Sequence, residues 1–223
     1  MKRDVDITQI WDGRYYGPSD LVRADTAGCS GCSHCCREMT DTIFLDPWDI
    51  YSLSKATGSS FEEMIDRCLL LEMADGLILP RLKGRENGSC VFLDENGRCS
   101  IHAYRPGFCR LFPLGRVYEG RTFRYFLQAD ECVMKNRAKV KVKKWLGIPN
   151  LALYENYIEK WHGFILDAGA LLEGAGESLR KSVCMAYLKT FFLQPYDTDA
   201  DFYAQFEERL ENAYRQIGMA PPR

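Results

Sequence analysis

The segment CSGCSHCC, residues 29–36, places four cysteines within eight residues, and this cluster constrains the fold of the chain more than any other feature. Its first three cysteines follow the spacing C-x2-C-x2-C. The glycine and serine residues between them permit a curled backbone, and a curled loop can direct three thiolates at one centre. The segment is therefore predicted to be a tight loop that surrounds a metal.

The chain holds ten cysteines in all, although its 223 residues, 46% of them hydrophobic, are enough to form a sizeable core without disulfides. The first twenty residues mix charges with aromatic residues and contain no long apolar stretch. We therefore expect neither a signal peptide nor a membrane anchor, and we expect a cytoplasmic protein whose ordinary thiols are reduced.

Clustered cysteines in a reduced compartment favour metal ligation over disulfides. Cys68 and Cys184 are exceptions, because each lies alone in an apolar, helix-like segment where a thiol packs as a small hydrophobic group. The remaining eight lie among glycine, serine, arginine and proline, where no apolar face would bury them. The predicted metal ligands are Cys29, Cys32, Cys35, Cys36, Cys90, Cys99, Cys109 and Cys132.

The triple spacing is typical of the first three ligands of a bacterial [4Fe–4S] site, and it also suits a zinc knuckle. Cys36 directly follows Cys35, and adjacent side chains rarely point at one tetrahedral ion. Cys36 could therefore face a second centre together with the downstream cysteines. Alternatively, fewer cysteines bind one centre and the rest lie beside it or are reactive. The sequence leaves the division of the eight cysteines, the metal and the number of centres open.

The fold class expected from the sequence is α+β, with a metal-organised cysteine-rich core and a small antiparallel sheet flanked by helices. Helical patterns with caps predict helices over 46–57 and 60–72, and alternating patterns predict strands in 76–82, 90–101 and 116–128. Turns are predicted at Asn96-Gly97 and Glu119-Gly120, which would make a hairpin of each of the last two segments. From about residue 133 the strand pattern gives way to helical segments at 151–172, 177–193 and 199–218. We predict a cysteine-cluster metal-binding domain over 1–145 and a helical C-terminal region over 146–223.

Arg98, Arg105, Arg110 and Arg116 interleave with two of the downstream cysteines. Guanidinium groups beside thiolates donate charge-assisted hydrogen bonds and lower thiol pKa values, so we interpret these arginines as part of the site. Among the histidines, His102 is a minor candidate ligand. His34 is expected beside the cluster, and His162 is expected to pack on a helix.

The run KNRAKVKVKK at 135–144 has six basic residues in ten. It lacks interleaved aromatic residues, and the chain carries a formal net charge of −2, so a solvated helix face is expected and nucleic-acid binding is not. We expect a protein partner and no membrane contact. No nucleophile elbow, H-E-x-x-H helix or P-loop is present, and whether the chain is an enzyme stays open.

These cysteines and their surroundings resemble a known family, the zinc- or iron-chelating cysteine-cluster proteins, also called the YkgJ-like or CxxCxxCC family. The resemblance covers about residues 29–132. It lies in CSGCSHCC at 29–36, Cys90, CSI at 99–101, RPGFCRLFP at 105–113 and Cys132. It implies metal chelation, through an iron–sulfur or zinc site, and a bacterial origin. Flagellin lysine methylases look similar over this region, but they are longer chains.

Three functions are consistent with the sequence. The preferred one is an iron–sulfur protein, in which Cys29, Cys32, Cys35 and one remote cysteine hold a cluster of the [4Fe–4S] type for electron transfer or support of a modification reaction. The second is a zinc-binding structural module that presents loops to a protein partner. The third is a protein-modifying enzyme related to the methylases. The ferredoxin-like triple spacing favours iron over zinc.

Overall fold

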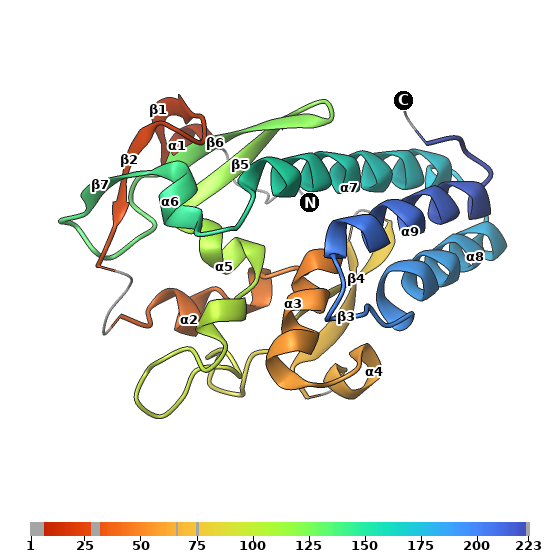
Figure 1. Ribbon diagram of the computed structural model, residues 1–223, viewed down its shortest axis with the longest axis horizontal. Helices are drawn as coiled ribbons and strands as arrows, with labels where there is room; N and C mark the ends of the chain where they lie inside the picture. The colour runs from red at the N-terminus through yellow and green to blue at the C-terminus, as the bar shows by residue number, and fades with distance from the viewer. Residues whose placement is uncertain (1–6, 28–31, 66, 75, 222–223) are drawn as a thin grey trace.

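The computed structural model describes residues 7–27, 32–65, 67–74 and 76–221. Over these residues the strands form three antiparallel sheets, with strand orders β1-β6-β5, β2-β7 and β3-β4 (Figure 1). Helices and small antiparallel sheets together confirm the predicted α+β class. The strands are β1 Trp11–Tyr16, β2 Leu21–Asp25, β3 Leu69–Ala74, β4 Leu77–Leu82, β5 Leu114–Glu119, β6 Thr122–Gln128 and β7 Ala138–Lys141.

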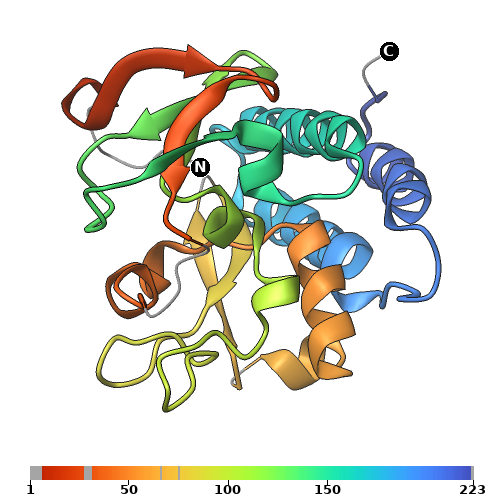
Figure 2. The same ribbon diagram turned by 60° about the vertical axis from the view of Figure 1, so that its left-hand side comes forward.

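Three long helices, α7, α8 and α9, lie together on one side of the molecule (Figures 1 and 2). The β1-β6-β5 and β2-β7 sheets lie at the other side, above a region of short helices and loops. No described helix is both long and apolar enough to cross a membrane. The helical elements are α1 Ile7–Ile10, α2 Cys35–Glu38, η1 Thr40–Thr42, α3 Pro47–Thr57, α4 Phe61–Met64, η2 His102–Tyr104, α5 Gly107–Leu111, α6 Val142–Leu146, α7 Leu151–Leu172, α8 Glu177–Leu188, the π-helix η3 Lys189–Leu193 and α9 Phe202–Gln216.

Helix α3 forms where the sequence predicts it. The Asp46 side chain accepts a hydrogen bond from the Asp49 backbone N–H (3.0 Å), and the Asp49 side chain accepts one from the Asp46 N–H (3.2 Å). Pro47 occupies the first turn, where it needs no hydrogen-bond partner, and Gly58 ends the helix with a φ of 67°. Local capping therefore fixes both ends of the helix.

The prediction of a helix over 60–72 is wrong beyond its first turn. Ser60 and Glu63 do form a capping box, but α4 ends at Met64. Residues 69–74 instead pair with 77–82 as a two-stranded sheet. Long-range pairing overrides the local helical pattern here, and Gly76 supplies the positive φ (78°) that the connection between β3 and β4 requires. Cys68 is buried, as expected, but on a connection instead of a helix.

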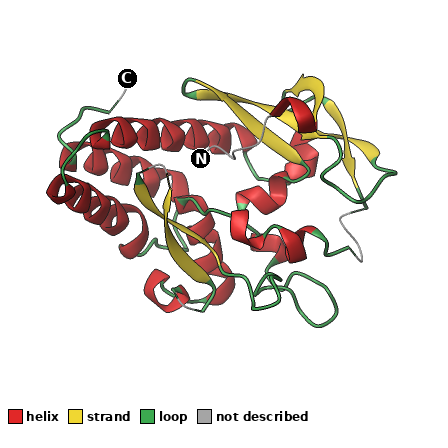
Figure 3. Ribbon diagram, turned by 180° about the vertical axis from the view of Figure 1, so that it is seen from behind, coloured by secondary structure: helices red, strands yellow, loops and turns green. Residues whose placement is uncertain are grey.

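The predicted strands at 90–101 are also wrong, although a turn is present there. Residues 84–101 form only two isolated bridges, Gly84 with Cys90 and Leu93 with Cys99. The Gly97 N–H donates to the Asp94 carbonyl (3.1 Å), which closes the expected turn. Figure 3 shows this segment as loop. The hairpin expected at 116–128 is confirmed as β5 and β6, which pair from Leu114 with Leu127 to Glu119 with Thr122.

Three further strands, β1, β2 and β7, were not expected. β1, within the first twenty residues, pairs with β6, and β7 pairs with β2 through positions such as Val22 and Val140. The basic run at 135–144 is therefore not one helix face, because it contains strand β7 and most of the short helix α6. Its alternation of lysine with valine suits a strand that buries Val140 and exposes the neighbouring lysines.

The helices predicted at 151–172, 177–193 and 199–218 are confirmed as α7, α8 with η3, and α9. Aromatic rings fill the space between them: Trp161 packs edge-on to Phe191 (5.0 Å between centroids), and Tyr157 packs edge-on to Phe206 (4.6 Å). The hydrophobic core extends from these helices to β5, β6 and α3. The division of the chain near residue 145 stays a prediction.

Candidate metal centre

The structure brings five of the eight predicted ligands together from three separate parts of the chain. Cys35 and Cys36 begin α2, Cys90 and Cys99 lie in the 84–101 loop, and Cys109 lies in α5. The five thiols lie near enough to shift one another's ionisation: Cys36 senses Cys90 and Cys109, and Cys109 senses Cys35, Cys90 and Cys99. Both adjacent cysteines therefore approach the same downstream thiols.

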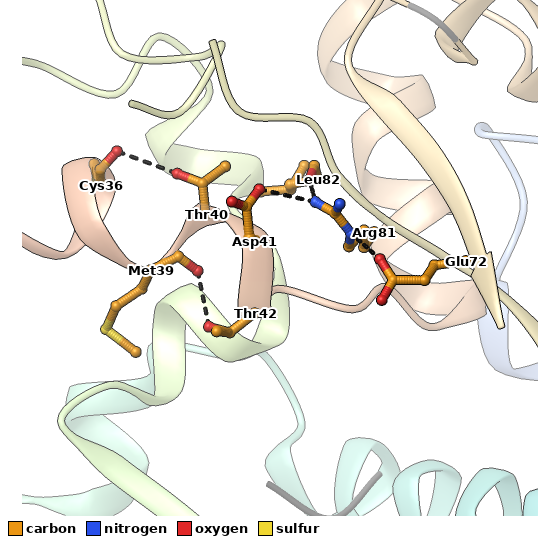
Figure 4. Close-up of polar contacts among 8 residues, drawn as sticks. All are labelled: Cys36, Met39, Thr40, Asp41, Thr42, Glu72, Arg81 and Leu82. Atoms are coloured by element: carbon orange, nitrogen blue, oxygen red, sulfur yellow. Dashed lines mark hydrogen bonds and ion pairs between the residues drawn. The ribbon is translucent and has the colours of Figure 1, made fainter. Parts of the chain in front are cut away.

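Backbone contacts fix the position of α2 against the loop. The Cys90 N–H donates to the Cys36 carbonyl (2.7 Å), and the Thr40 hydroxyl approaches the same carbonyl (3.4 Å). Farther along, Arg81 of β4 bonds Asp41 through Nη1 (2.9 Å) and also pairs with Glu72 of β3 (Figure 4). The helix that begins with Cys35 and Cys36 is thus tied on one side to Cys90 and on the other to the β3-β4 sheet.

The 84–101 loop is ordered by its own hydrogen bonds. The Asp94 side chain accepts from the backbone N–H groups of Asn96 (3.0 Å) and Arg98 (2.7 Å). Arg85 Nη2 donates to the carbonyls of Val91 (2.9 Å) and Leu93 (2.8 Å). These contacts hold Cys90 and Cys99 at the two ends of a compact turn without a sheet.

Helix α5, which carries Cys109, is held by a buried polar group that the sequence did not reveal. Asp49 Oδ1 accepts the Gly107 backbone N–H (2.7 Å), so a carboxylate of α3 satisfies a free N–H at the start of α5. A β-carbon at Gly107 would lie 2.4 Å from the Tyr154 hydroxyl oxygen, so the position has room only for glycine. Asp49 is 1% exposed and Tyr154 is fully buried.

Burial makes both carboxyl groups of the α3 cap harder to ionise. Desolvation raises the pKa of Asp46, and desolvation together with the charge of Asp46 raises the pKa of Asp49. Arg116 opposes both effects, and its Nη2 donates to the Tyr154 hydroxyl (3.1 Å). Asp49 of α3, Arg116 of β5 and Tyr154 of α7 therefore form a buried polar network beside α5, the helix that carries Cys109.

The adjacent cysteines Cys35 and Cys36 ionise unequally. A hydrogen bond from the Cys36 thiol lowers the pKa of Cys35 to about 7, although burial opposes the shift. The same bond, followed by burial, raises the pKa of Cys36. Cys35 is therefore the thiol of the pair that gives up its proton more readily.

Burial raises the pKa of Cys90, Cys99 and Cys109, and neighbouring thiols add to the effect. Arg85 opposes the shift at Cys90, and Arg105 opposes it at Cys99. At neutral pH these three thiols hold their protons unless a cation replaces the proton. A bound metal does this, because coordination deprotonates a thiol.

The chemistry of this set suits zinc or iron, which both favour thiolate ligands. Arg105 adds to the fit, because its buried Nε has no hydrogen-bond partner among the described residues, and sulfur anions would supply an acceptor. Within the same described part of the chain, no three His, Cys, Asp or Glu side chains converge in the geometry of a bound ion. Cys29 lies outside the described residues.

Of the three remaining predicted ligands, Cys32 and Cys132 are described and Cys29 lies outside the described residues. Cys32 precedes α2 and is partly exposed. Cys132 is buried in the turn that follows β6, where its carbonyl accepts from Arg137 Nη1 (3.4 Å). Whether Cys29, Cys32 and Cys132 bind metal stays a prediction.

The histidines differ in position. His34 pairs with the exposed Glu38 (2.9 Å) at the edge of α2. His102 contacts Arg105 Nη1 (2.5 Å), and burial together with Arg105 lowers its pKa. His162 stacks on Tyr118 with ring centroids 3.8 Å apart, as packing on a helix predicts.

The arginine prediction is correct for only part of the set. Arg105 acts on Cys99. Arg110 lies over the Trp48 ring (5.6 Å), donates through Nε to the Arg105 carbonyl (3.0 Å) and interacts with Cys109. Arg116 is not beside the thiols, because β5 directs it into the tyrosines around Tyr154. Arg85, outside the predicted set, acts on Cys90.

Comparison with known proteins agrees with this chemistry. The CxxCxxCC family, described as a "putative zinc- or iron-chelating domain", matches residues 28–138. Neither a search of curated proteins nor a search of solved structures finds a match to the chain. The matched segment contains all eight predicted ligands, from Cys29 to Cys132. Through these residues the chain belongs to the CxxCxxCC family.

Proposed function

We propose that this chain holds an iron–sulfur cluster that serves electron transfer or supports a modification reaction. The observation that carries the proposal is the approach of five thiols from three separate segments, next to the C-x2-C-x2-C loop. Cys29, Cys32 and Cys35 would supply three ligands. The fourth would come from Cys90, Cys99 or Cys109.

Two features support iron over zinc. The spacing C-x2-C-x2-C of Cys29, Cys32 and Cys35 is typical of the first three ligands of a bacterial [4Fe–4S] site. Arg105 lies beside Cys99 with a free buried Nε. Hydrogen bonds to cluster sulfurs adjust the reduction potential, so this guanidinium has a role at an iron–sulfur centre beyond charge balance.

The direct test is metal analysis with an absorption spectrum on anaerobically purified protein. We expect broad absorption near about 400 nm and roughly four irons with matching sulfide per chain. Stoichiometric zinc in a colourless protein would contradict the proposal and would favour the structural module that presents loops to a protein partner. Binding of S-adenosylmethionine to the metal-loaded protein would instead favour the protein-modifying enzyme.

Matched cysteine variants test the ligand set. Cys99→Ser and Cys109→Ser remove thiols from the group of five and should lower the metal content. Cys184→Ser makes the same chemical change at a buried site outside the group and should leave the metal content unchanged. Equal metal content in all three variants would contradict the assignment.

A further inference from the structure

The two-stranded sheet of β2 and β7 has one side that faces solvent and is basic. Its register opposes Leu21 with Lys141, Val22 with Val140 and Arg23 with Lys139. Opposed residues share a side of a sheet, and so do alternate residues of one strand. The two valines are buried on one side, and the other four residues are exposed on the opposite side. We call the exposed side, made of Leu21, Arg23, Lys139 and Lys141, the basic face. Figure 1 shows this sheet at the end of the molecule away from α8.

The basic face contains a pair of like charges that works against the sheet. Arg23 lies directly opposite Lys139, and like charges in opposed positions destabilise a strand pair. Exposed lysine on an edge strand discourages aggregation, but that role does not require an arginine opposite it. A negatively charged group bound to the face would remove the repulsion. The opposed pair therefore points to an anionic partner.

The positive charge of this face is not balanced within the described part of the chain. Lys143 and Lys144, exposed in α6, extend it beyond β7. The ion pairs among the described residues include neither these lysines nor the cations of the basic face. The carboxylates at the two ends of β2 bind backbone groups instead: Asp20 accepts from the Gly17 N–H (2.7 Å), and Asp25 accepts from the Ala27 N–H (2.9 Å). Over residues 20–25 and 138–144, positive side chains outnumber negative ones five to two.

Hydrogen bonds hold this sheet in place before any partner arrives. Arg137 Nε donates to the Arg23 carbonyl (2.8 Å), and its Nη2 donates to the Ala129 carbonyl (3.0 Å). Strand pairing continues beyond β7, because the Val142 N–H donates to the Asp20 carbonyl (3.0 Å). The basic face is thus preformed, which lowers the entropic cost of binding.

Leu21 indicates which kind of anionic partner fits. It is 56% exposed and lies among the cations, opposite Lys141. An apolar side chain surrounded by charged ones is typical of a protein–protein interface, which has an apolar centre and a polar rim. Single-stranded nucleic acid is held by aromatic rings, and the basic face has none. One leucine also offers little apolar area to a membrane surface.

We propose that the basic face binds an acidic segment of a partner protein, with carboxylates of the segment against Arg23, Lys139 and Lys141 and an apolar side chain against Leu21. Exposed ion pairs are individually weak and are screened by salt, so the complex is transient and forms fastest at low ionic strength. The proposal goes beyond the proposed cluster and does not require it, since none of the five grouped cysteines belongs to the face.

The test uses the metal-loaded full chain and a probe peptide of about ten glutamates around one central leucine. Backbone amide shifts in nuclear magnetic resonance spectra report binding. At a salt concentration of about 0.05 M we expect a Kd on the order of 1 mM, with shifts in residues 21–25 and 138–144 and weaker binding at about 0.3 M. The same peptide with glutamine in place of every glutamate is the uncharged control and should not bind.

Two double variants remove equal charge at different places. Lys139→Gln with Lys141→Gln should weaken binding of the glutamate peptide about tenfold. It should not lower the free energy of unfolding, because the like-charge pair disappears. Lys181→Gln with Lys189→Gln makes the same change at exposed positions of α8 and η3 and should leave binding unaltered.

Several results would overturn the proposal. They are no binding of the glutamate peptide below about 10 mM, equal binding of the glutamine peptide, and equal behaviour of the two double variants. Tighter binding of an oligothymidylate of equal charge would assign the face to nucleic acid. Binding to phosphatidylserine vesicles that is lost in the Lys139→Gln, Lys141→Gln variant would assign it to a membrane surface. Metal content measured on the same samples tests the proposed cluster, so the two proposals can fail separately.

Discussion

Different interactions stabilise the cysteine region and the helical C-terminal region of this chain. In the C-terminal region, rings such as Tyr157, Phe164 and Phe206 are at most 1% exposed and pack on one another between α7, α8 and α9. In the cysteine region, none of the five grouped thiols belongs to a fully buried residue, and the longest helix that carries one, α5, has five residues. Hydrophobic burial dominates in the first region, and polar contacts dominate in the second.

The difference shows where a metal would matter for folding. A helix of four or five residues is not stable by its own hydrogen bonds, and two isolated bridges add little. Besides hydrogen bonds of its own, the cysteine region is held by contacts from outside: Asp49 binds α5, and Arg81 binds the segment after α2. Thiolate–metal bonds would supply the cross-links that this region otherwise lacks.

The largest expected effect follows from metal removal. A chelator that strips the metal should abolish hydrogen-exchange protection in residues 32–41 and 84–111, because binding energy at structural metal sites is on the order of 10 kcal/mol and appears as folding energy. Residues 151–172 and 202–216 should keep their protection, since packed rings hold them. Hydrogen exchange followed by mass spectrometry measures both regions in one sample.

Readdition of the metal serves as the control and should restore protection in the cysteine region. Unchanged protection in residues 84–111 after complete metal loss would show that polar contacts alone order this region. The comparison between the two regions would then be wrong.

The second effect concerns the helical region alone. Phe206 is fully buried against Tyr157 and Phe191, so Phe206→Ala should reduce the free energy of unfolding by about 3–5 kcal/mol. Metal content per folded chain should not change. Urea denaturation with metal analysis checks both values, and a large loss of metal in this variant would show that the regions do not order independently.

The success of the sequence predictions follows the same division. The helices at 46–57 and 151–172 carry their own signals, which are caps for the first and a continuous apolar face for the second. The local pattern predicts a helix through 69–72, because the pairing of 69–74 with 77–82 depends on contacts that local periodicity does not show. The turn at 94–97 was identifiable from its Asn-Gly pair, but the strands beside it were not formed.

The sequence predicts which cysteines form the candidate site, but it does not predict which contacts bring them together. The spacing identified Cys35, Cys36, Cys90, Cys99 and Cys109, which the structure brings together. Asp49 was not identified as a support for α5, because an Asp three residues after a cap residue is explained by local capping. Its second bond, to Gly107, joins residues 58 positions apart.

A smaller effect tests the junction of the two regions at Gly107. Gly107→Ala would place a β-carbon 2.4 Å from the Tyr154 hydroxyl oxygen, and Tyr154 is buried and bonded to Arg116. We expect a loss of about 1–3 kcal/mol in the free energy of unfolding and a lower metal content, because α5 and Cys109 must shift. Urea denaturation and metal analysis measure the two consequences.

Two further variants sharpen this test. Gly176→Ala is the matched control, since its β-carbon would meet nothing within 4 Å, and its effect should be small. Combining Gly107→Ala with Tyr154→Phe removes the obstructing hydroxyl and should recover part of the lost metal. Full metal content in Gly107→Ala alone would show that the position of α5 does not control the site.

The smallest effect is expected at Cys184, which lies in the helical region and is 5% exposed. Its sulfur is 3.9 Å from the Gly76 carbonyl, so the hydroxyl of Cys184→Ser keeps an acceptor nearby and the cost to stability should be about 1 kcal/mol or less. Metal content should equal that of the unaltered chain, whereas Cys109→Ser should lose metal. Metal loss in Cys184→Ser, measured at equal folded fraction, would mean that a cysteine of the helical region takes part in metal binding. Metal binding would then stabilise both regions, and the contrast between them would be wrong.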